Sequence, residues 1–291
     1  MDILPQLLAN GIIAGALYAL LALGFNLLYG ATRVFDFSYG AVAIAGAYAA
    51  YFFSHALGLS MFASAVAGIL LSAILAYILN FLIYHPLRRR KATTTVLLVA
   101  SIGAFTLIQA IIAMLFTSQF RQLLETEAGT RELLGATFTN VHLLTIALSL
   151  IATALVWLLL AKTGFGRSVR AVSDDQEVAM FVGINTEKII GLVFLLSGAI
   201  AGLAGLLAAL DTGMEPTRGL MLLLKGIIAA IIGGFGDIRG GLLGGFFLGL
   251  AENLGIWKIS GEWKDAIAFA LLILFLLFRP YGILNKKQRL Q

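Results

Sequence analysis

Two glycine-rich stretches hold the polar residues whose chemistry suits binding of a polar solute. In the first stretch an aspartate, a serine and a tyrosine precede a glycine, and in the second a glutamate and an asparagine follow a run of glycines. Carboxylate, hydroxyl and amide groups are costly in apolar surroundings, so they are expected to have a role there. The candidate residues are Asp36, Ser38, Tyr39, Gly40, Glu252 and Asn253.

The two stretches share a spacing, because Asp36 precedes Gly40 as Asp237 precedes Gly241. Interrupted, glycine-rich segments at corresponding positions of two halves are typical of transporters built from repeats, in which they line the pathway. The spacing therefore suggests an internal repeat, although two ordinary turns with solvated charges would have the same pattern. In that second interpretation Asp36 equally well pairs with Arg33.

Glu252 needs a partner, because a charge inside an apolar run costs about 2.5–3.5 kcal/mol on insertion scales. A salt bridge or hydrogen bond between helices, or a place at the outer rim beside Trp257 and Lys258, is favoured over a direct solute contact.

A short charged segment, Ser173–Asn185, lies between two long apolar runs. Ser173 followed by Gln176 has the spacing of a capping box, and the acidic residues between them suit the start of a helix dipole. Gly183 can end the helix in the left-handed conformation, and Asn185 can cap the next helix. The pattern predicts a short amphipathic helix from Ser173 to Gly183.

This helix is marginal alone in water, so its own protein, lipid or a partner must hold it. Helices that rest on a membrane surface are usually basic, and an acidic face is unfavourable at anionic lipid. A protein partner is therefore favoured over an interfacial helix. The residues that we expect to serve the partner are Ser173, Asp174, Asp175, Glu177, Ala179, Phe181 and Gly183.

The composition sets the class of protein that must position these residues. Of the 291 residues, 60% are hydrophobic and only 12% are charged, about half the charged share of a soluble domain. Continuous apolar runs, rather than alternating ones, predict helices and not a β-barrel. We expect an all-α, polytopic integral membrane protein, a single transmembrane domain over 1–291, with lipid as its solvent and no nucleic-acid partner.

The apolar runs give eight or nine transmembrane or half-membrane helices, since a span needs about 20 residues. The first run is expected to remain in the protein rather than to act as a cleaved leader. Six runs are long and three are short and glycine-rich: 7–29, 61–84, 94–117, 142–161, 187–210 and 266–279; then 40–53, 220–235 and 241–257.

Basic residues indicate the orientation. Four lysines and arginines lie in each of the segments 85–91, 162–188 and 279–289. The positive-inside rule puts these segments in the cytoplasm, and alternating crossings then put the first residues outside and the C-terminus inside. The short charged helix lies in the cytoplasmic 162–188 loop.

Several stretches resemble a known family. "EVAMFVG" (Glu177–Gly183) resembles the E-A-A-x-x-x-G signature of ABC importer membrane subunits, with Val178 in place of the second alanine. The wider segment 164–189 is similar to the branched-chain amino acid permeases, as are 10–30, 35–51, 233–252 and 276–284 in order along the chain. One departure is that Tyr39 and Ala41 replace a histidine and a glutamate common in the family, which leaves the solute open.

The resemblance implies an importer permease in the inner, or plasma, membrane of a prokaryote. It implies two cytoplasmic ATPase subunits, a second permease that is a paralogue, and a periplasmic or lipid-anchored solute-binding protein. The chain itself has no G-x-x-x-x-G-K-[ST] phosphate loop, so ATP binds to the partner subunits and no cofactor is expected here. Urea or a short amide is the alternative solute.

Three other classes compete with this interpretation. A secondary transporter needs ion-coupling carboxylates inside several helices, and these are scarce. A channel would conduct through the broken segments without ATP. A membrane enzyme is disfavoured, because the sequence has neither H-E-x-x-H nor G-x-S-x-G, no cysteine, and three histidines far apart.

Overall fold

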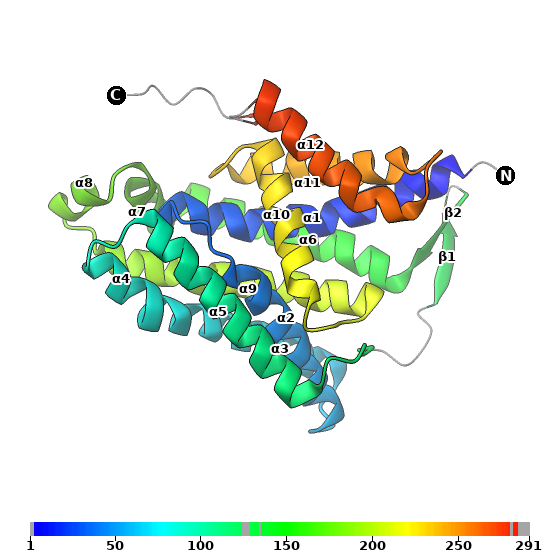
Figure 1. The fold of residues 1–291 in the computed structure, drawn as a ribbon, viewed down its shortest axis with the longest axis horizontal. Coiled ribbons are helices and arrows are strands. Elements are labelled where there is room, and N and C mark those ends of the chain that lie inside the picture. The colour runs from blue at the N-terminus through cyan, green and yellow to red at the C-terminus, as the bar shows by residue number, and fades with distance from the viewer. Residues whose placement is uncertain (1–2, 124–128, 134, 280–281, 285–291) are drawn as a thin grey trace. The chain divides into compact units, whose positions relative to one another are not determined.

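The computed structural model describes residues 3–123, 129–133, 135–279 and 282–284, which fold almost entirely into helices (Figure 1). In chain order these are α1 (Leu4–Thr32), α2 (Ser38–His55), α3 (Met61–Leu79), the π-helix η1 (Asn80–Tyr84), α4 (His85–Arg89), α5 (Thr94–Phe116), α6 (Asn140–Lys162), α7 (Gly164–Asp174), α8 (Gln176–Phe181), α9 (Thr186–Thr212), α10 (Arg218–Gly233), α11 (Ile238–Gly255), the short 3-10 helix η2 (Gly261–Trp263) and α12 (Lys264–Phe278). Strands β1 (Thr130–Leu133) and β2 (Ala136–Thr139) form an antiparallel hairpin.

The predicted all-α membrane class is confirmed, and each of the nine apolar runs forms a helix. Among the residues that the structure describes, five segments are long and apolar enough to span a membrane: α1, the continuous Met61–Arg89, α5, α6 and α9. The pair α10 and α11, bent by 113° at its break, counts as a sixth at most. The predicted eight or nine crossings are therefore more than the five or six spans that length and composition support in the described residues. Predicted features on 124–128, 280–281 and 285–291 lie outside the described residues.

The chain divides into two compact units. Unit 1 comprises Met1–Asn26, Leu124–Thr153 and Leu224–Gln291, and unit 2 comprises Leu27–Leu123 and Ala154–Leu223. The boundaries fall inside α1, α6 and α10 rather than in loops. The division does not follow the two halves of the sequence, so the internal repeat stays a prediction.

In unit 2, α2, α3 and α9 pack closely through small residues. A Cβ on Gly205 of α9 would lie 1.9 Å from the carbonyl oxygen of Ala43 of α2, so only glycine fits. The buried Ser72 hydroxyl of α3 donates to the carbonyl of Val42 at 3.2 Å. Such contacts are the usual basis of helix association in lipid, where the hydrophobic effect does not drive helices together.

In unit 1, α11 packs against α1 in the same way. A Cβ on Gly245 would lie 2.3 Å from the backbone nitrogen of Ala19. The break between α10 and α11 is held by two side chains. Asp237 caps α11 by accepting from the Arg239 N–H at 2.9 Å. The Asn26 side chain of α1 accepts from the Gly236 N–H through its oxygen and donates to the Asp237 carbonyl through its nitrogen. The break is therefore a built feature of the unit and not a frayed helix end.

Candidate functional site

The predicted charged helix exists as α8, but it starts later than the capping-box pattern indicated. Ser173 lies within α7, and Asp175 is the N-cap of α8: its Oδ1 accepts from the N–H groups of Glu177 at 2.8 Å and Val178 at 3.1 Å. The prediction of Ser173 as the cap is wrong, because Asp175 takes the extended backbone (φ −153°, ψ 118°) that separates the two helices. Asp174 accordingly is the last residue of α7.

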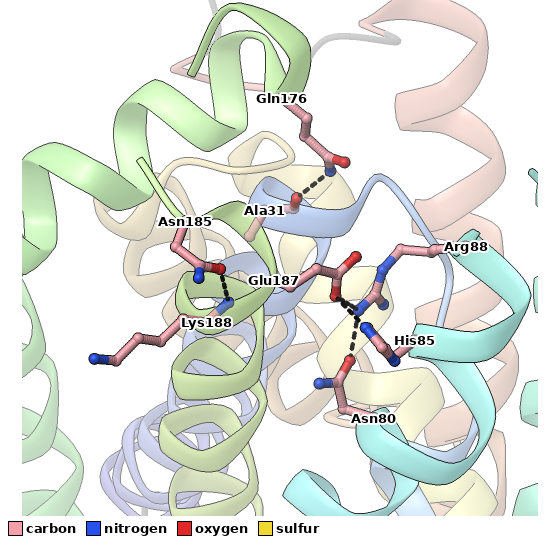
Figure 2. Close-up of polar contacts among 8 residues, drawn as sticks. All are labelled: Ala31, Asn80, His85, Arg88, Gln176, Asn185, Glu187 and Lys188. Carbon is pink, nitrogen blue, oxygen red and sulfur yellow. Dashed lines mark hydrogen bonds and ion pairs between the residues drawn. The ribbon is translucent and has the colours of Figure 1, made fainter. Parts of the chain in front are cut away.

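The end of α8 follows the prediction. Gly183 has φ +87°, and the Ile184 N–H donates to the Ala179 carbonyl at 3.0 Å, which closes the helix in a left-handed turn. Asn185 then caps α9 by accepting from the Lys188 N–H at 3.0 Å (Figure 2). Both local predictions are confirmed, and they connect α8 to α9 by a short turn of defined conformation.

The apolar side chains of α8 are mostly uncovered by this chain. Ala179 is buried, but Phe181 is 89% exposed and Val182 is 70% exposed. Val178 and Met180 are exposed as well. A short helix that exposes large apolar side chains next to acidic ones has the surface of a docking element.

The α7–α8 junction is held by the end of α1. The Gln176 amide donates to the Ala31 carbonyl at 2.9 Å (Figure 2). The Arg33 guanidinium donates to the Ser173 carbonyl, also at 2.9 Å, at the C-terminal end of α7 where the helix dipole favours a cation. Arg33 itself has φ +55°, an uncommon conformation for a residue other than glycine. The proposed pairing of Arg33 with Asp36 is therefore wrong.

A second attachment lies at the start of α9. Glu187 forms an ion pair with Arg88 at 2.9 Å, with His85 at 3.9 Å on the same oxygen (Figure 2). Arg88 also donates to the side-chain oxygen of Asn80 at 2.8 Å. The Arg88 side chain is 12% exposed, so solvent screens these contacts only partly.

Asp36, in the break between α1 and α2, is the acceptor at a buried polar centre. Its Oδ1 accepts from the Ser38 N–H at 2.8 Å, the Ser38 hydroxyl at 2.6 Å and the Tyr84 hydroxyl at 2.5 Å. Ser101 of α5 accepts from the Phe37 N–H at 3.1 Å beside it. The break is thus closed by side chains from α2, η1 and α5.

A small cavity adjoins this centre. Its volume is about 10 Å³, room for roughly one water molecule. Three of the predicted pathway residues, Asp36, Ser38 and Tyr39, line it together with Phe194 and Ser197 of α9. Gly40 instead packs closely against α10, where a Cβ would lie 2.3 Å from the carbonyl oxygen of Gly219.

Glu252 belongs to unit 1 and is part of a buried ion-pair cluster. Its Oε1 lies 2.5 Å from Lys225 Nζ, and Tyr18 donates to Oε2 at 2.9 Å. Lys225 also pairs with the half-exposed Asp265 at 2.8 Å. The expected salt bridge between helices is confirmed, and rim placement is not needed to explain Glu252.

Asn253, next to Glu252, is also buried. Its amide donates to the Gly249 carbonyl at 2.9 Å, whereas its Oδ1 has no hydrogen-bond partner within the described part of the chain. Across the residues that the structure describes, no group of three or more histidine, aspartate or glutamate side chains could hold a metal.

The sequence reasoning missed Tyr84 and Lys225. Lys225 is the only charge in the apolar run of α10 after Arg218, and that isolation is a signal that could have paired it with Glu252. Tyr84 had no such signal. No sequence pattern places a tyrosine at the end of the apolar run 61–84 beside Asp36, which lies 48 positions earlier in the chain.

Comparison with known proteins adds similarity along nearly the whole chain. Residues 7–276 match the family model described as branched-chain amino acid transport system, permease component. The chain is 30% identical to the high-affinity branched-chain amino acid permease BraD of Pseudomonas aeruginosa, covering 97% of this chain and 96% of that protein. It is 30% identical to LivH of Salmonella typhimurium, with the same shares covered.

A further relative and a solved structure extend the likeness. A probable LivH of Methanocaldococcus jannaschii is 29% identical over 96% of this chain and 91% of its own length. A chain of PsaBC from Streptococcus pneumoniae, solved with a Fab, has a TM-score of 0.52 at 16% identity, covering 96% of this chain and 93% of that one. At that identity the structural likeness concerns the fold alone.

Proposed function

The chain belongs to the permease component family of branched-chain amino acid transport systems, and from this we propose that it forms part of the membrane path of an importer driven by separate ATPase subunits. The proposed solute is a branched-chain or related amino acid, since the relatives are named for such solutes. The remaining components are two cytoplasmic ATPases, a second, paralogous permease and a solute-binding protein outside the membrane. The whole of 1–291 acts as one permease domain.

The observation that carries the proposal is the exposed apolar surface of α8. Phe181 and Val182 are exposed at a helix that is also attached to the membrane-spanning part through Gln176 and Ala31. A partner that covers these side chains can therefore move α1 through a direct contact. Because the sequence has no phosphate loop, that partner is the component that uses ATP.

The proposed mechanism is rigid-body rocking of the permease when the ATPase pair closes on nucleotide. α8 receives the displacement through Phe181 and its acidic first turn, which contains Glu177. Gly183 keeps the turn into α9 in one conformation, so the displacement reaches α9 with little loss. Arg33 passes it to the break between α1 and α2, where the buried Asp36 centre lies.

Asp36, Ser38 and Tyr39 are the proposed solute contacts, because they line the cavity in unit 2, which has to widen during the rocking motion to admit more than one water molecule. A carboxylate in an apolar surrounding suits the ammonium group of an amino acid. Glu252 and Asn253 contribute by holding the α10–α11 pair, since the Glu252 carboxylate is already paired with Lys225. Gly40 contributes by close packing of α2.

The proposed location is the plasma membrane of a prokaryote, with the loops 85–91 and 162–188 and the C-terminus in the cytoplasm. α8 then faces the compartment that contains ATP. This orientation is supported by the basic residues of these segments.

The test is reconstitution of this chain with its partner permease, ATPases and solute-binding protein in liposomes, with radiolabelled leucine as the probe. We expect leucine to accumulate only with ATP and all subunits present. Accumulation by the permeases alone would indicate a secondary transporter or a channel and would refute the proposal. ATP-dependent uptake of urea, with none of leucine, would replace the amino acid by the alternative solute.

A further inference from the structure

We propose that the π-helical segment η1 links the start of α9 to the buried Asp36 centre, with Glu187, Arg88 and Tyr84 as positioning residues. The inference rests on the proposed function, because it describes how a displacement of α8 reaches the solute cavity. All of these residues belong to unit 2.

The first observation is the π-helix itself, which lies within one continuous membrane span. The His85 N–H donates to the carbonyl of Asn80, five residues earlier, instead of to the residue four positions back. Pro86 follows, has no N–H, and its ring would collide with the carbonyl of the preceding turn in a regular α-helix. π-Helical turns are rare and are frequent at functional sites. η1 therefore departs from α-helical bonding for a local cause, Pro86.

The second observation is the set of contacts at the first residue of η1. Asn80 accepts from Arg88 at 2.8 Å, and Arg88 also contacts Glu187 in the first turn of α9 at 2.9 Å (Figure 2). The Arg88 guanidinium thus spans η1 and connects it to α9. Because Asn185 caps α9 directly after the Gly183 turn, a movement of α8 changes the position of Glu187.

The third observation is the contact at the last residue of η1. The Tyr84 ring stacks on Phe194 of α9, with centroids 5.2 Å apart, and its hydroxyl donates to Asp36 at 2.5 Å. Phe194 and Asp36 both line the small cavity. The first residue of this five-residue π-helix is therefore linked to the start of α9, and its last residue contacts the residues that line the cavity.

The wide turn of η1 is kept in place by Pro86, which disfavours the α-helical bonding that would close it. A displacement of Glu187 moves Arg88 and, through Arg88, Asn80 at the first residue of η1. Motion of η1 then moves Tyr84 away from Asp36, and the cavity loses one of its closing contacts. Nucleotide-driven motion of α8 supplies the displacement of Glu187.

The test uses an introduced cysteine as a reporter. Its labelling is specific within this chain, because the sequence has no other cysteine. Val42→Cys places a thiol at the cavity wall with little change in side-chain volume. The full transporter, with its ATPases bound, is labelled with 2-aminoethyl methanethiosulfonate with and without ATP. Glu187→Gln is the test variant. The matched control is Lys188→Gln, whose parent side chain points away from the Glu187 cluster (Figure 2).

We expect ATP to change the labelling rate at Val42→Cys, and Glu187→Gln to reduce that change by about 2- to 30-fold, the range for residues that carry coupling. Lys188→Gln retains it. The swapped pair Glu187→Arg with Arg88→Glu restores it, because the Asn80 amide can donate to the new carboxylate. Pro86→Ala, which allows regular α-helical bonding, also reduces the ATP effect.

An unchanged ATP effect in Glu187→Gln, or no ATP effect in the parent, would overturn the link. Neither result affects the proposed function if the parent complex still hydrolyses ATP and accumulates leucine. Failure of the ATPases to bind the parent chain would instead refute the proposed function itself. Copurification of the ATPases is measured for each variant, so that a loss of ATPase binding is distinguished from a loss of coupling through η1.

Discussion

The Tyr84 hydroxyl donates to Oδ1 of Asp36 at 2.5 Å, which joins the end of a π-helix to the break between α1 and α2. Both residues are buried, and Ser38 donates to the same oxygen by its N–H and its hydroxyl. A buried carboxyl group held in this way fixes the backbone of the break, since each lost donor leaves a buried oxygen short of a hydrogen bond.

Tyr84→Phe tests this contact without removing the aromatic ring. We expect a loss of about 1–3 kcal/mol in stability, the cost of leaving a buried acceptor short of a donor. The measurement is the unfolding temperature in detergent. Tyr77→Phe is the control, because Tyr77 is 44% exposed and its hydroxyl has no hydrogen bond among the residues that the structure describes. Equal shifts for both variants would contradict the assigned role.

Phe181→Ala tests docking at α8. With Phe181 89% exposed in this chain, we expect the free permease to change in stability by less than about 0.5 kcal/mol. ATPase binding should weaken by about 2 kcal/mol or more, roughly 30-fold in Kd, if Phe181 is a central contact. Phe62→Ala, at the 80% exposed residue near the start of α3, is the control. Undiminished ATPase binding would argue against docking there.

Gly183→Ala tests the turn that joins α8 to α9. An alanine at φ +87° costs about 1–2 kcal/mol, and Gly183→Pro is incompatible because proline requires a negative φ. Glu177→Lys instead reverses the charge favoured in the first turn of α8. We expect all three to lower the amount of leucine transported per ATP hydrolysed.

Gly58→Ala is the control for the turn, since Gly58 also has positive φ and open space around its Cβ position. It should cost similar stability without changing the transport ratio. A wild-type ratio in Gly183→Pro would count against α8 as the coupling element.

Glu252→Gln tests the buried ion pair of unit 1. It leaves the Lys225 ammonium without its buried partner, so we expect a loss of about 3–5 kcal/mol. Asp265→Asn should cost at most about 1 kcal/mol, because that carboxylate is half-exposed and solvent screens it. The apolar pair Lys225→Met with Glu252→Leu should recover most of the stability. Similar losses for the two single variants would contradict the assignment of Glu252 as the main partner.

Much of the fold could be predicted from the apolar runs. Each of the nine apolar runs forms a helix, because lipid forces every backbone group in a span into internal hydrogen bonds. Gly183 and Asn185 were predictable because their roles depend on local backbone geometry alone. The cap of α8 was misplaced by two residues because Ser173 and Asp175 are both good caps. In the structure Ser173 continues α7, and its carbonyl accepts from Arg33.

The polar centres could be predicted only in part. Asp36 and Glu252 stand out in apolar surroundings, but their partners come from other helices whose packing no local pattern reveals. The π-helix could not be predicted from the sequence for a different reason. Pro86 signals a disturbed helix, yet a kink, a helix end and a π-turn are all consistent with one proline in the sequence.

Cysteine cross-linking at α8 tests the central claim most directly. Phe181→Cys, in a chain that has no other cysteine, should be cross-linked to an ATPase subunit of the assembled transporter by a short maleimide–succinimidyl ester reagent, which joins the thiol to a lysine amine, whereas Phe62→Cys should not. Labelling of the same Phe181→Cys in intact cells by a thiol reagent that cannot cross the membrane would place α8 outside and contradict the account.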